Sequence, residues 1–65
     1  MDGWKYWEGK RIYIILKSNR RYSGEVLEVS QEHNGICWIT ILDKYNKRIS
    51  FVNSEIELIQ EENKL

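Results

Sequence analysis

Side chains that could carry out catalysis are few in this sequence. The only histidine, His33, and the only cysteine, Cys37, lie four residues apart. A nucleophilic site would also need a third group that orients the base and a site for an oxyanion. The sequence has no glycine-rich phosphate loop and no metal-ligand spacing. We therefore expect no enzyme, no catalytic residue, no metal, no cofactor and no small-molecule substrate, and we expect Cys37 to be a small buried hydrophobic residue.

Basic side chains offer a different chemistry, the binding of phosphate groups. Ten basic and ten acidic residues cancel in total, but basic residues gather in the first third of the chain and glutamates near its end. The folded molecule could thus show one basic and one acidic region. Lys17, Arg20 and Arg21 form the densest basic cluster and could contact phosphates. Solvated charges on a hairpin would explain the same cluster.

The length of 65 residues allows one domain, spanning 1–65, with a small core. A single cysteine excludes an internal disulfide, so partner subunits are the remaining way to add stability. The apolar residues are mostly β-branched or aromatic and the chain has no alanine, which favours an all-β fold. No apolar stretch is long enough to span a bilayer, and the N-terminus lacks the apolar run of a signal peptide. We therefore expect a cytoplasmic protein that does not bind membranes.

The N-terminal segment, residues 1–9, is expected to be a turn or short helix over 2–8 or, alternatively, an extended arm. Asp2 would be the N-cap of the helix and Gly9 would end it. The helix would place Trp4 and Trp7 on the same side, where they could cover the open end of a barrel, with Trp38 as a candidate partner. A ligand cage made of these aromatic residues is the alternative.

Residues 10–60 read as five short strands joined by turns. The strands are expected over 10–17, from 21 onward, and over 36–42, 48–52 and 55–59. In the first strand Ile12, Ile14 and Leu16 are expected to point one way and Tyr13 and Ile15 the other. The side chains expected to face the core in the last two strands are Ile49, Phe51, Ile56 and Leu58. In the second strand the apolar positions change phase after Val26, and Gly24 indicates a bulge or sharp bend. These strands fit a small SH3-like or OB-like barrel, and residues 61–65 are expected to be a frayed acidic tail.

The order of residues from Ile12 to Val26 resembles the first motif of the Sm-like (LSm) family, in its small archaeal type. The motif is an apolar strand ending in Leu16-Lys17, a turn carrying an arginine, an aromatic residue and a glycine at the bend of the second strand. Asn34 stands where the loop asparagine of the family is expected relative to Gly24. The sequence departs from the family at Ser30, where an Asp is usual, at His33, which directly precedes the Asn, and at Val52-Asn53, where many members carry Arg-Gly.

The resemblance implies a five-stranded, strongly bent Sm fold that assembles into a homo-oligomeric ring. Family members close rings of six or seven subunits by pairing the fourth strand of one subunit with the fifth strand of the next. Neither of these two strands contains proline, so both can pair at an edge. The alternative is a monomer or dimer whose edges are protected by charged residues. The residues expected at the subunit interface are Arg48, Ser50, Val52, Glu55, Glu57 and Ile59.

The resemblance also implies binding of single-stranded, often uridine-rich RNA, in RNA processing or turnover. In the family, the loops after strands two and four face the pore and bind one base per subunit. His33 could stack on a base, whereas Asn34 and Asn53 could hydrogen-bond its edge. A simple hairpin turn would explain His33-Asn34-Gly35 as well. The candidate RNA-binding residues are His33, Asn34, Asn53, Arg20, Arg21 and Lys17. The alternative function is an SH3-like barrel that acts as a protein-interaction or scaffolding module without RNA binding.

Overall fold

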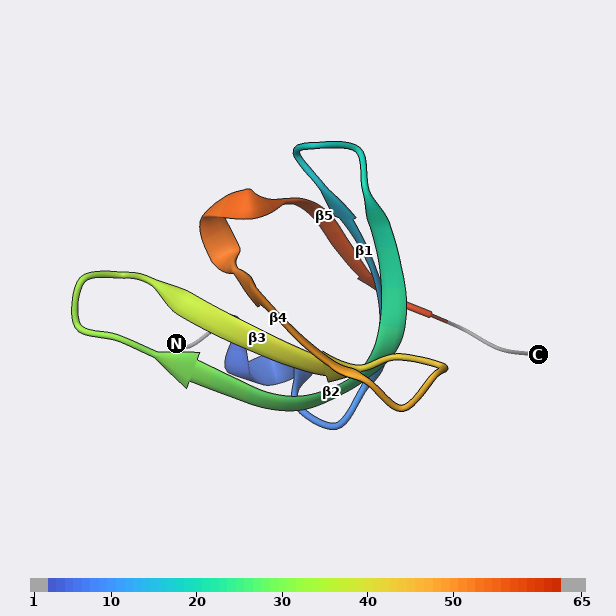
Figure 1. Ribbon diagram of the computed structural model, residues 1–65. Helices are drawn as coiled ribbons and strands as arrows, with labels where there is room; N and C mark the ends of the chain where they lie inside the picture. Colours follow the sequence, from blue (N-terminus) through green and yellow to red (C-terminus); the bar gives the residue numbers. More distant parts are fainter. Residues whose placement is uncertain (1–2, 63–65) are drawn as a thin grey trace.

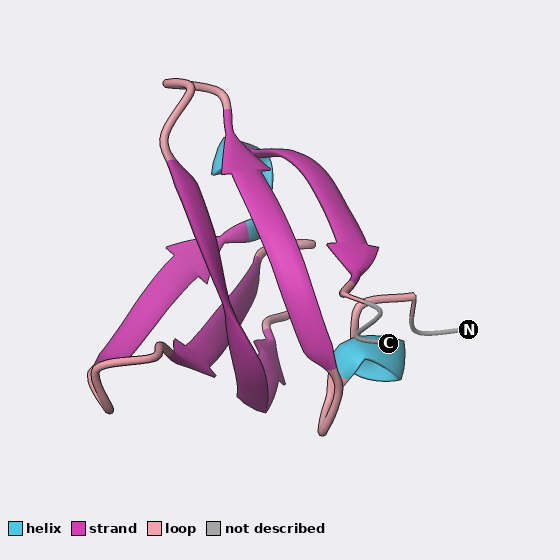
Figure 2. Ribbon diagram, turned by 90° about the vertical axis from the view of Figure 1, so that its right-hand side faces the viewer, coloured by secondary structure: helices cyan, strands magenta, loops and turns pink. Residues whose placement is uncertain are grey.

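The computed structural model describes residues 3–62, which form five antiparallel strands in a single sheet (Figure 1). The elements are, in chain order, η1 (Lys5–Trp7), β1 (Arg11–Leu16), β2 (Arg21–Gln31), β3 (Cys37–Leu42), β4 (Arg48–Val52), η2 (Asn53–Glu55) and β5 (Ile56–Glu61). The order in the sheet is β4-β3-β2-β1-β5, so β4 and β5 are its two edges. The prediction of an all-β chain is confirmed, and the sheet is bent but not closed (Figure 2).

The bend of the sheet lies in β2, the longest strand. The register between β2 and β3 shifts between Val26 and Glu28, so Leu27 is a bulge residue and its side chain is exposed. The predicted bulge is therefore confirmed, three residues beyond Gly24. Gly24 itself allows a close approach of two strands, because a Cβ built on it would collide with the carbonyl oxygen of Leu42 and lie 2.9 Å from the carbonyl carbon.

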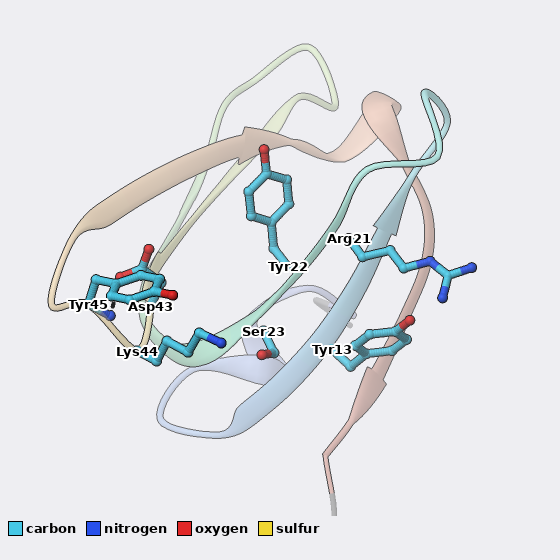
Figure 3. A pocket seen from close by; sticks show the side chains of 7 residues that line it. All are labelled: Tyr13, Arg21, Tyr22, Ser23, Asp43, Lys44 and Tyr45. Atoms are coloured by element: carbon cyan, nitrogen blue, oxygen red, sulfur yellow. Dashed lines mark hydrogen bonds between the residues drawn. The ribbon is translucent and has the colours of Figure 1, made fainter.

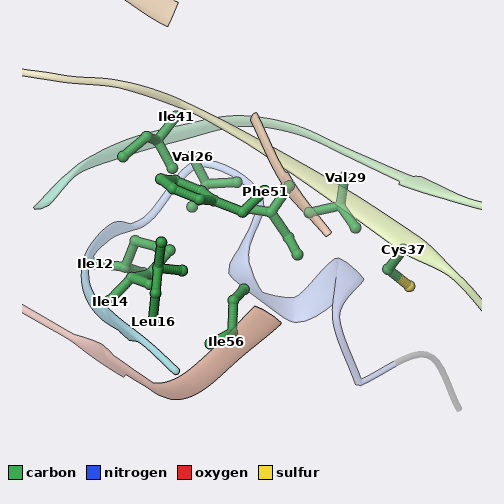
Figure 4. Packing of buried hydrophobic residues seen from close by; sticks show 10 residues of the cluster. Ile12, Ile14, Leu16, Val26, Val29, Cys37, Ile41, Phe51 and Ile56 are labelled. Atoms are coloured by element: carbon green, nitrogen blue, oxygen red, sulfur yellow. The ribbon is translucent and has the colours of Figure 1, made fainter. Parts of the chain in front are cut away.

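The core is formed by one face of the sheet (Figure 4). Its buried residues are Ile12, Ile14, Leu16, Val26, Val29, Cys37, Ile39, Ile41, Phe51 and Ile56. All but one of the predicted inward-facing side chains lie in this core or pack against it, and Cys37 is a buried free cysteine as expected. The exception is Leu58, which is exposed, while its neighbour Ile59 packs against the core instead. The cause is a second bulge, because Ile15 pairs with Leu58 and Leu16 pairs with Ile56, which leaves Glu57 out of the register.

The N-terminal segment covers the part of β2 that β1 does not reach. The expected turn or short helix is a single 3-10 turn, η1, and the expected N-cap Asp2 lies outside the described residues. Gly9 N–H donates to the Val26 carbonyl at 2.9 Å, and the carboxylate of Glu8 accepts the N–H of Val29 at 2.9 Å. These two bonds occupy main-chain groups of β2 beyond the end of β1.

Trp4 and Trp7 both pack against the core, as the helical interpretation predicts. Trp38, considered as their partner, lies between the buried residues Cys37 and Ile39 on β3 and projects from the opposite face, 42% exposed. The outer face of β3 therefore stays uncovered by the N-terminal segment.

The acidic C-terminal segment is ordered further than predicted. β5 continues through Glu61, and Glu62 N–H donates to the Arg11 carbonyl at 2.9 Å. Glu61, which was expected in a frayed tail, is thus the last residue of β5, and Glu62 is bonded to Arg11 next to β1; residues 63–65 of the predicted tail lie outside the described part. In residues 3–62 no helix has the length and apolar character needed to cross a membrane.

Candidate nucleic-acid interface

The η2 turn brings together two of the loops that contain predicted RNA-binding residues. The side chain of Asn53 accepts the N–H of Cys37 at 3.2 Å and donates to the carbonyl of Gly35 at 3.2 Å. On the other side of η2, Lys17 N–H donates to the carbonyl of Glu55 at 2.9 Å. Asn53 therefore lies beside the loop that carries His33 and Asn34, although 19 residues separate Asn34 from Asn53 in the sequence.

The three predicted base-binding residues differ in what they can offer a ligand. His33 is exposed at the tip of the β2–β3 turn. Asn34 is also exposed; its Oδ1 accepts the N–H of Ile36 at 3.3 Å, and the amide nitrogen stays available for a ligand. Both polar atoms of Asn53 already bond to main-chain groups of the same chain. Asn53 thus holds the loop in place, while His33 and Asn34 are the side chains that can bind a base.

The basic cluster occupies the β1–β2 hairpin. Leu16 N–H donates to the Arg20 carbonyl at 2.8 Å, and Asn19 adopts a positive φ of 73°, as tight turns require. Lys17, Arg20 and Arg21 are all exposed. The three residues do not share one environment. The main chain of Lys17 bonds to Glu55 of η2, whereas Arg21 is the first residue of β2 and lines a groove that is described below.

The outer edge of β4 directs alternate main-chain groups into solvent. In an antiparallel strand bonded on one side only, every second residue turns its N–H and C=O outward. The bond from Glu32 N–H to the Ile36 carbonyl, 2.8 Å, sets the phase of this alternation for β2 and β3, and the β3–β4 register extends it to β4. The residues whose main-chain groups face outward are Arg48, Ser50 and Val52.

These outward groups of β4 are partly engaged within the chain. Val52 N–H donates to the carboxylate of Glu55 at 3.1 Å, which protects one end of the edge. The hydroxyl of Ser50 hydrogen-bonds that of Thr40 at 2.9 Å across the strand pair. The main-chain groups of Arg48 and Ser50 remain directed outward, so an added strand could bond to them.

The outer edge of β5 has a similar arrangement. The bond from Glu62 N–H to the Arg11 carbonyl sets the alternation, which directs the main-chain groups of Ile59 and Glu61 outward. Glu57, at the bulge, is exposed. The side chain of Ile59 packs against the core of the chain, so only its main-chain groups are directed outward.

A groove that the sequence analysis missed lies at the opposite end of β3 from His33 (Figure 3). It is open to solvent, has a volume of about 330 Å³, and is lined by Tyr13, Arg21, Tyr22, Ser23, Asp43, Lys44 and Tyr45. From the sequence, residues 43–47 are predicted only as a connection between two strands. The available signal was an exposed tyrosine in a turn closed by Asp43, next to two further tyrosines on neighbouring strands.

The carboxyl of Glu8 has a pKa that its surroundings lower. The hydrogen bond from Val29 N–H lowers the pKa of the Glu8 carboxyl below its ordinary value of 4.5; burial opposes this, and Lys5 contributes in the same direction. Lys5 Nζ lies 3.5 Å from Glu8 Oε2. Within residues 3–62, no three His, Cys, Asp or Glu side chains gather as a metal site would require.

Comparison with protein-family models, with curated proteins and with solved structures returned no match. The function has to be argued from the residues and their geometry.

Proposed function

We propose that this chain is an RNA-binding subunit of a homo-oligomeric, Sm-like ring that acts in the cytoplasm in RNA processing or turnover. The observation that carries the proposal is the position of β4 and β5 at the two edges of one sheet, with main-chain groups of Arg48, Ser50 and Ile59 directed outward. In the ring, β4 of one subunit pairs with β5 of the next. In the same proposal the strongly bent sheet is the SH3-like barrel of the Sm fold, whose edges β4 and β5 are left for the neighbouring subunits.

Ring closure would cover the unpaired strand edges and would add buried surface to a small core. Unpaired strand edges invite aggregation unless they are covered, and pairing β4 with β5 covers both edges of every subunit. A 65-residue chain also has a small core, so burial between subunits adds stability that the monomer lacks. Trp38 is 42% exposed and sits opposite Val52 in the β3–β4 register, which places apolar surface beside the β4 edge.

The RNA site in this proposal is the β2–β3 loop supported by η2. The imidazole of His33 stacks on a base, and the amide of Asn34 hydrogen-bonds the base edge. Asn53 positions the loop through Cys37 and Gly35. A ring repeats this weak site six or seven times around one pore, and multivalency raises the overall affinity.

The test is a fluorescence titration of the intact protein with oligouridine. We expect binding that weakens as salt rises, as phosphate contacts require, and that falls in Asn34→Ala. Ser54→Ala is the matched control, because Ser54 is exposed on η2 and no side-chain hydrogen bond involves it in the described part of the chain. Absence of binding at low salt would refute the RNA function.

The alternative function is a protein-interaction or scaffolding module. One observation favours it, the tyrosine-lined groove, because aromatic grooves on small barrels also bind extended peptides. A monomer that fails to bind oligouridine but binds a peptide in this groove would support the alternative.

A further inference from the structure

We propose that the groove lined by Tyr13, Tyr22 and Tyr45 is a second RNA-binding site, which holds one base of a single strand and the adjacent phosphate. The ligand class rests on the proposed function, but the site is physically separate. The groove follows Leu42, whereas His33 lies before Cys37, and six residues of extended strand span about 20 Å.

The tyrosine rings provide flat faces for a base. Tyr22 is held in place by Phe51, with 4.9 Å between ring centroids and 52° between ring planes. Tyr45 is 70% exposed at a turn, and Tyr13 is half-buried on β1. Figure 3 shows Tyr45 on the β3–β4 turn and Tyr13 across the groove from it, whereas the ring of Tyr22, whose β1 partner is the buried Ile14, is directed to the core side of β2. Stacking on aromatic side chains is the general way in which single strands are bound.

The β3–β4 turn is shaped before any ligand arrives. Oδ1 of Asp43 accepts the N–H of Tyr45 at 2.8 Å and that of Lys47 at 2.9 Å, and Asn46 takes a positive φ of 63°. A preformed turn reduces the ordering cost of binding. The same bonds engage the carboxylate of Asp43, the acidic side chain among the lining residues.

The charge of the groove favours an anion. Arg21 and Lys44 line it, against one carboxylate. Neither basic side chain forms an ion pair within residues 3–62, and Lys44 Nζ lies 5.4 Å from the centroid of the Tyr45 ring. Lys44 beside the exposed ring of Tyr45, with Arg21 as a second cation of the lining, matches the base and the phosphate of one nucleotide.

The main chain of β2 can read the edge of the base. Bonds from Leu16 N–H to the Arg20 carbonyl and from Val26 N–H to the Lys10 carbonyl set the alternation between β1 and β2. It directs the N–H and C=O groups of Arg21 and Ser23 away from β1. β3 pairs with β2 only from Glu25 onward, so these groups open toward the groove.

The dimensions favour a nucleotide over a peptide strand. A volume of about 330 Å³ is at the small end of ligand sites, which begin at about 300 Å³.

The test is fluorescence anisotropy with fluorescein-labelled six-nucleotide oligouridine, in an Asn34→Ala background that weakens the loop site. We expect residual binding that falls at least about fivefold when Tyr45→Ala is added, as loss of base stacking requires. Arg21→Ala should lower the affinity and reduce its salt dependence. Tyr6→Ala is the matched control, because Tyr6 is 60% exposed on η1, outside the groove, and should leave the affinity unchanged.

Three results would overturn the proposal. Binding that Asn34→Ala alone abolishes would assign all RNA binding to the loop. Residual binding that neither Tyr45→Ala nor Arg21→Ala changes would exclude the groove. Amide resonances of residues 21–23 and 43–45 that respond to a proline-rich peptide and not to oligouridine would make the groove a peptide site. Loss of affinity in Tyr45→Ala with no effect of Asn34→Ala would instead support the groove and refute the loop site.

Discussion

The substitution Gly24→Ala should destabilise the protein strongly, although it adds only a methyl group. Gly24 is buried where β2 bends, and its backbone lies against the last residue of β3. The new Cβ would overlap the carbonyl oxygen of Leu42 and lie 2.9 Å from the carbonyl carbon and 3.3 Å from the Cα of Asp43. All three contacts are with main chain, so no side-chain rotation can relieve them.

The size of the effect follows from what must move. Contact at ordinary distances begins near 3.4 Å, so the end of β3 must shift by several tenths of an ångström. Overpacking of this kind costs about 1–3 kcal/mol, and a weakened hydrogen bond between Glu25 and Leu42 adds about 1 kcal/mol. Alanine regains about 0.5–1 kcal/mol over glycine within a strand. The net loss is about 1–3.5 kcal/mol, or a fall in Tm of roughly 4–28 °C for a domain of this size.

The assay is thermal unfolding followed by circular dichroism at one fixed protein concentration, because assembly makes Tm depend on concentration. Gly3→Ala is the matched control: nothing lies within 4 Å of a Cβ at that position and its φ is not in the left-handed region. Its Tm should stay within about 3 °C of the wild type, the effect of roughly 0.5 kcal/mol. A Gly24→Ala protein that melts at the temperature of Gly3→Ala would refute the close approach of β2 and β3.

Three further predictions concern the β4 edge, the hydrogen bonds of Asn53 and the carboxyl of Glu8. Ser50→Pro should leave the chain folded but weaken the proposed assembly, because the N–H of Ser50 faces outward. Ile49→Pro should instead lower the free energy of unfolding by about 3 kcal/mol, because it removes a hydrogen bond to β3. Analytical ultracentrifugation measures the loss of assembly, and urea unfolding measures the loss of stability. Asn53→Ala should lower the free energy of unfolding by about 1–3 kcal/mol, because it leaves the N–H of Cys37 without its partner, whereas Ser54→Ala should not. Equal urea midpoints for the two variants would contradict the role of Asn53 in holding the β2–β3 loop. The lowered pKa of Glu8 stabilises the fold above about pH 4.5, and this contribution is lost as pH falls through the folded pKa. In urea titrations, the difference in unfolding free energy between wild type and Glu8→Gln should therefore be larger at pH 7 than at about pH 3. A difference that does not change with pH would contradict the prediction.

The strands could be predicted because their apolar residues alternate strictly. Ile12, Ile14 and Leu16 have a period of two on one buried face, and the same pattern placed Phe51 inside. Prediction failed where a bulge changes the phase. Leu58 follows the alternation from Ile56 in sequence, but the extra residue Glu57 turns Leu58 outward and Ile59 inward.

The candidate site was predictable in its local turns and not in its long-range contacts. The His33-Asn34-Gly35 turn follows from residue preferences, with Gly35 at a positive φ of 87°. The bonds of Asn53 to Cys37 and Gly35 depend on how η2 packs against the β2–β3 hairpin, which no local pattern encodes. The groove was missed for the same reason, since Tyr13 and Tyr45 come together only through the bend of β2.

The mass of the protein in solution tests the ring most directly. Each chain weighs 7.9 kDa, so light scattering on the eluting protein should give about six or seven times this mass, near 47 or 55 kDa. Binding of oligouridine should leave that mass unchanged apart from the added RNA. A single species of 7.9 kDa at every concentration would contradict the ring and the repeated RNA site that depends on it.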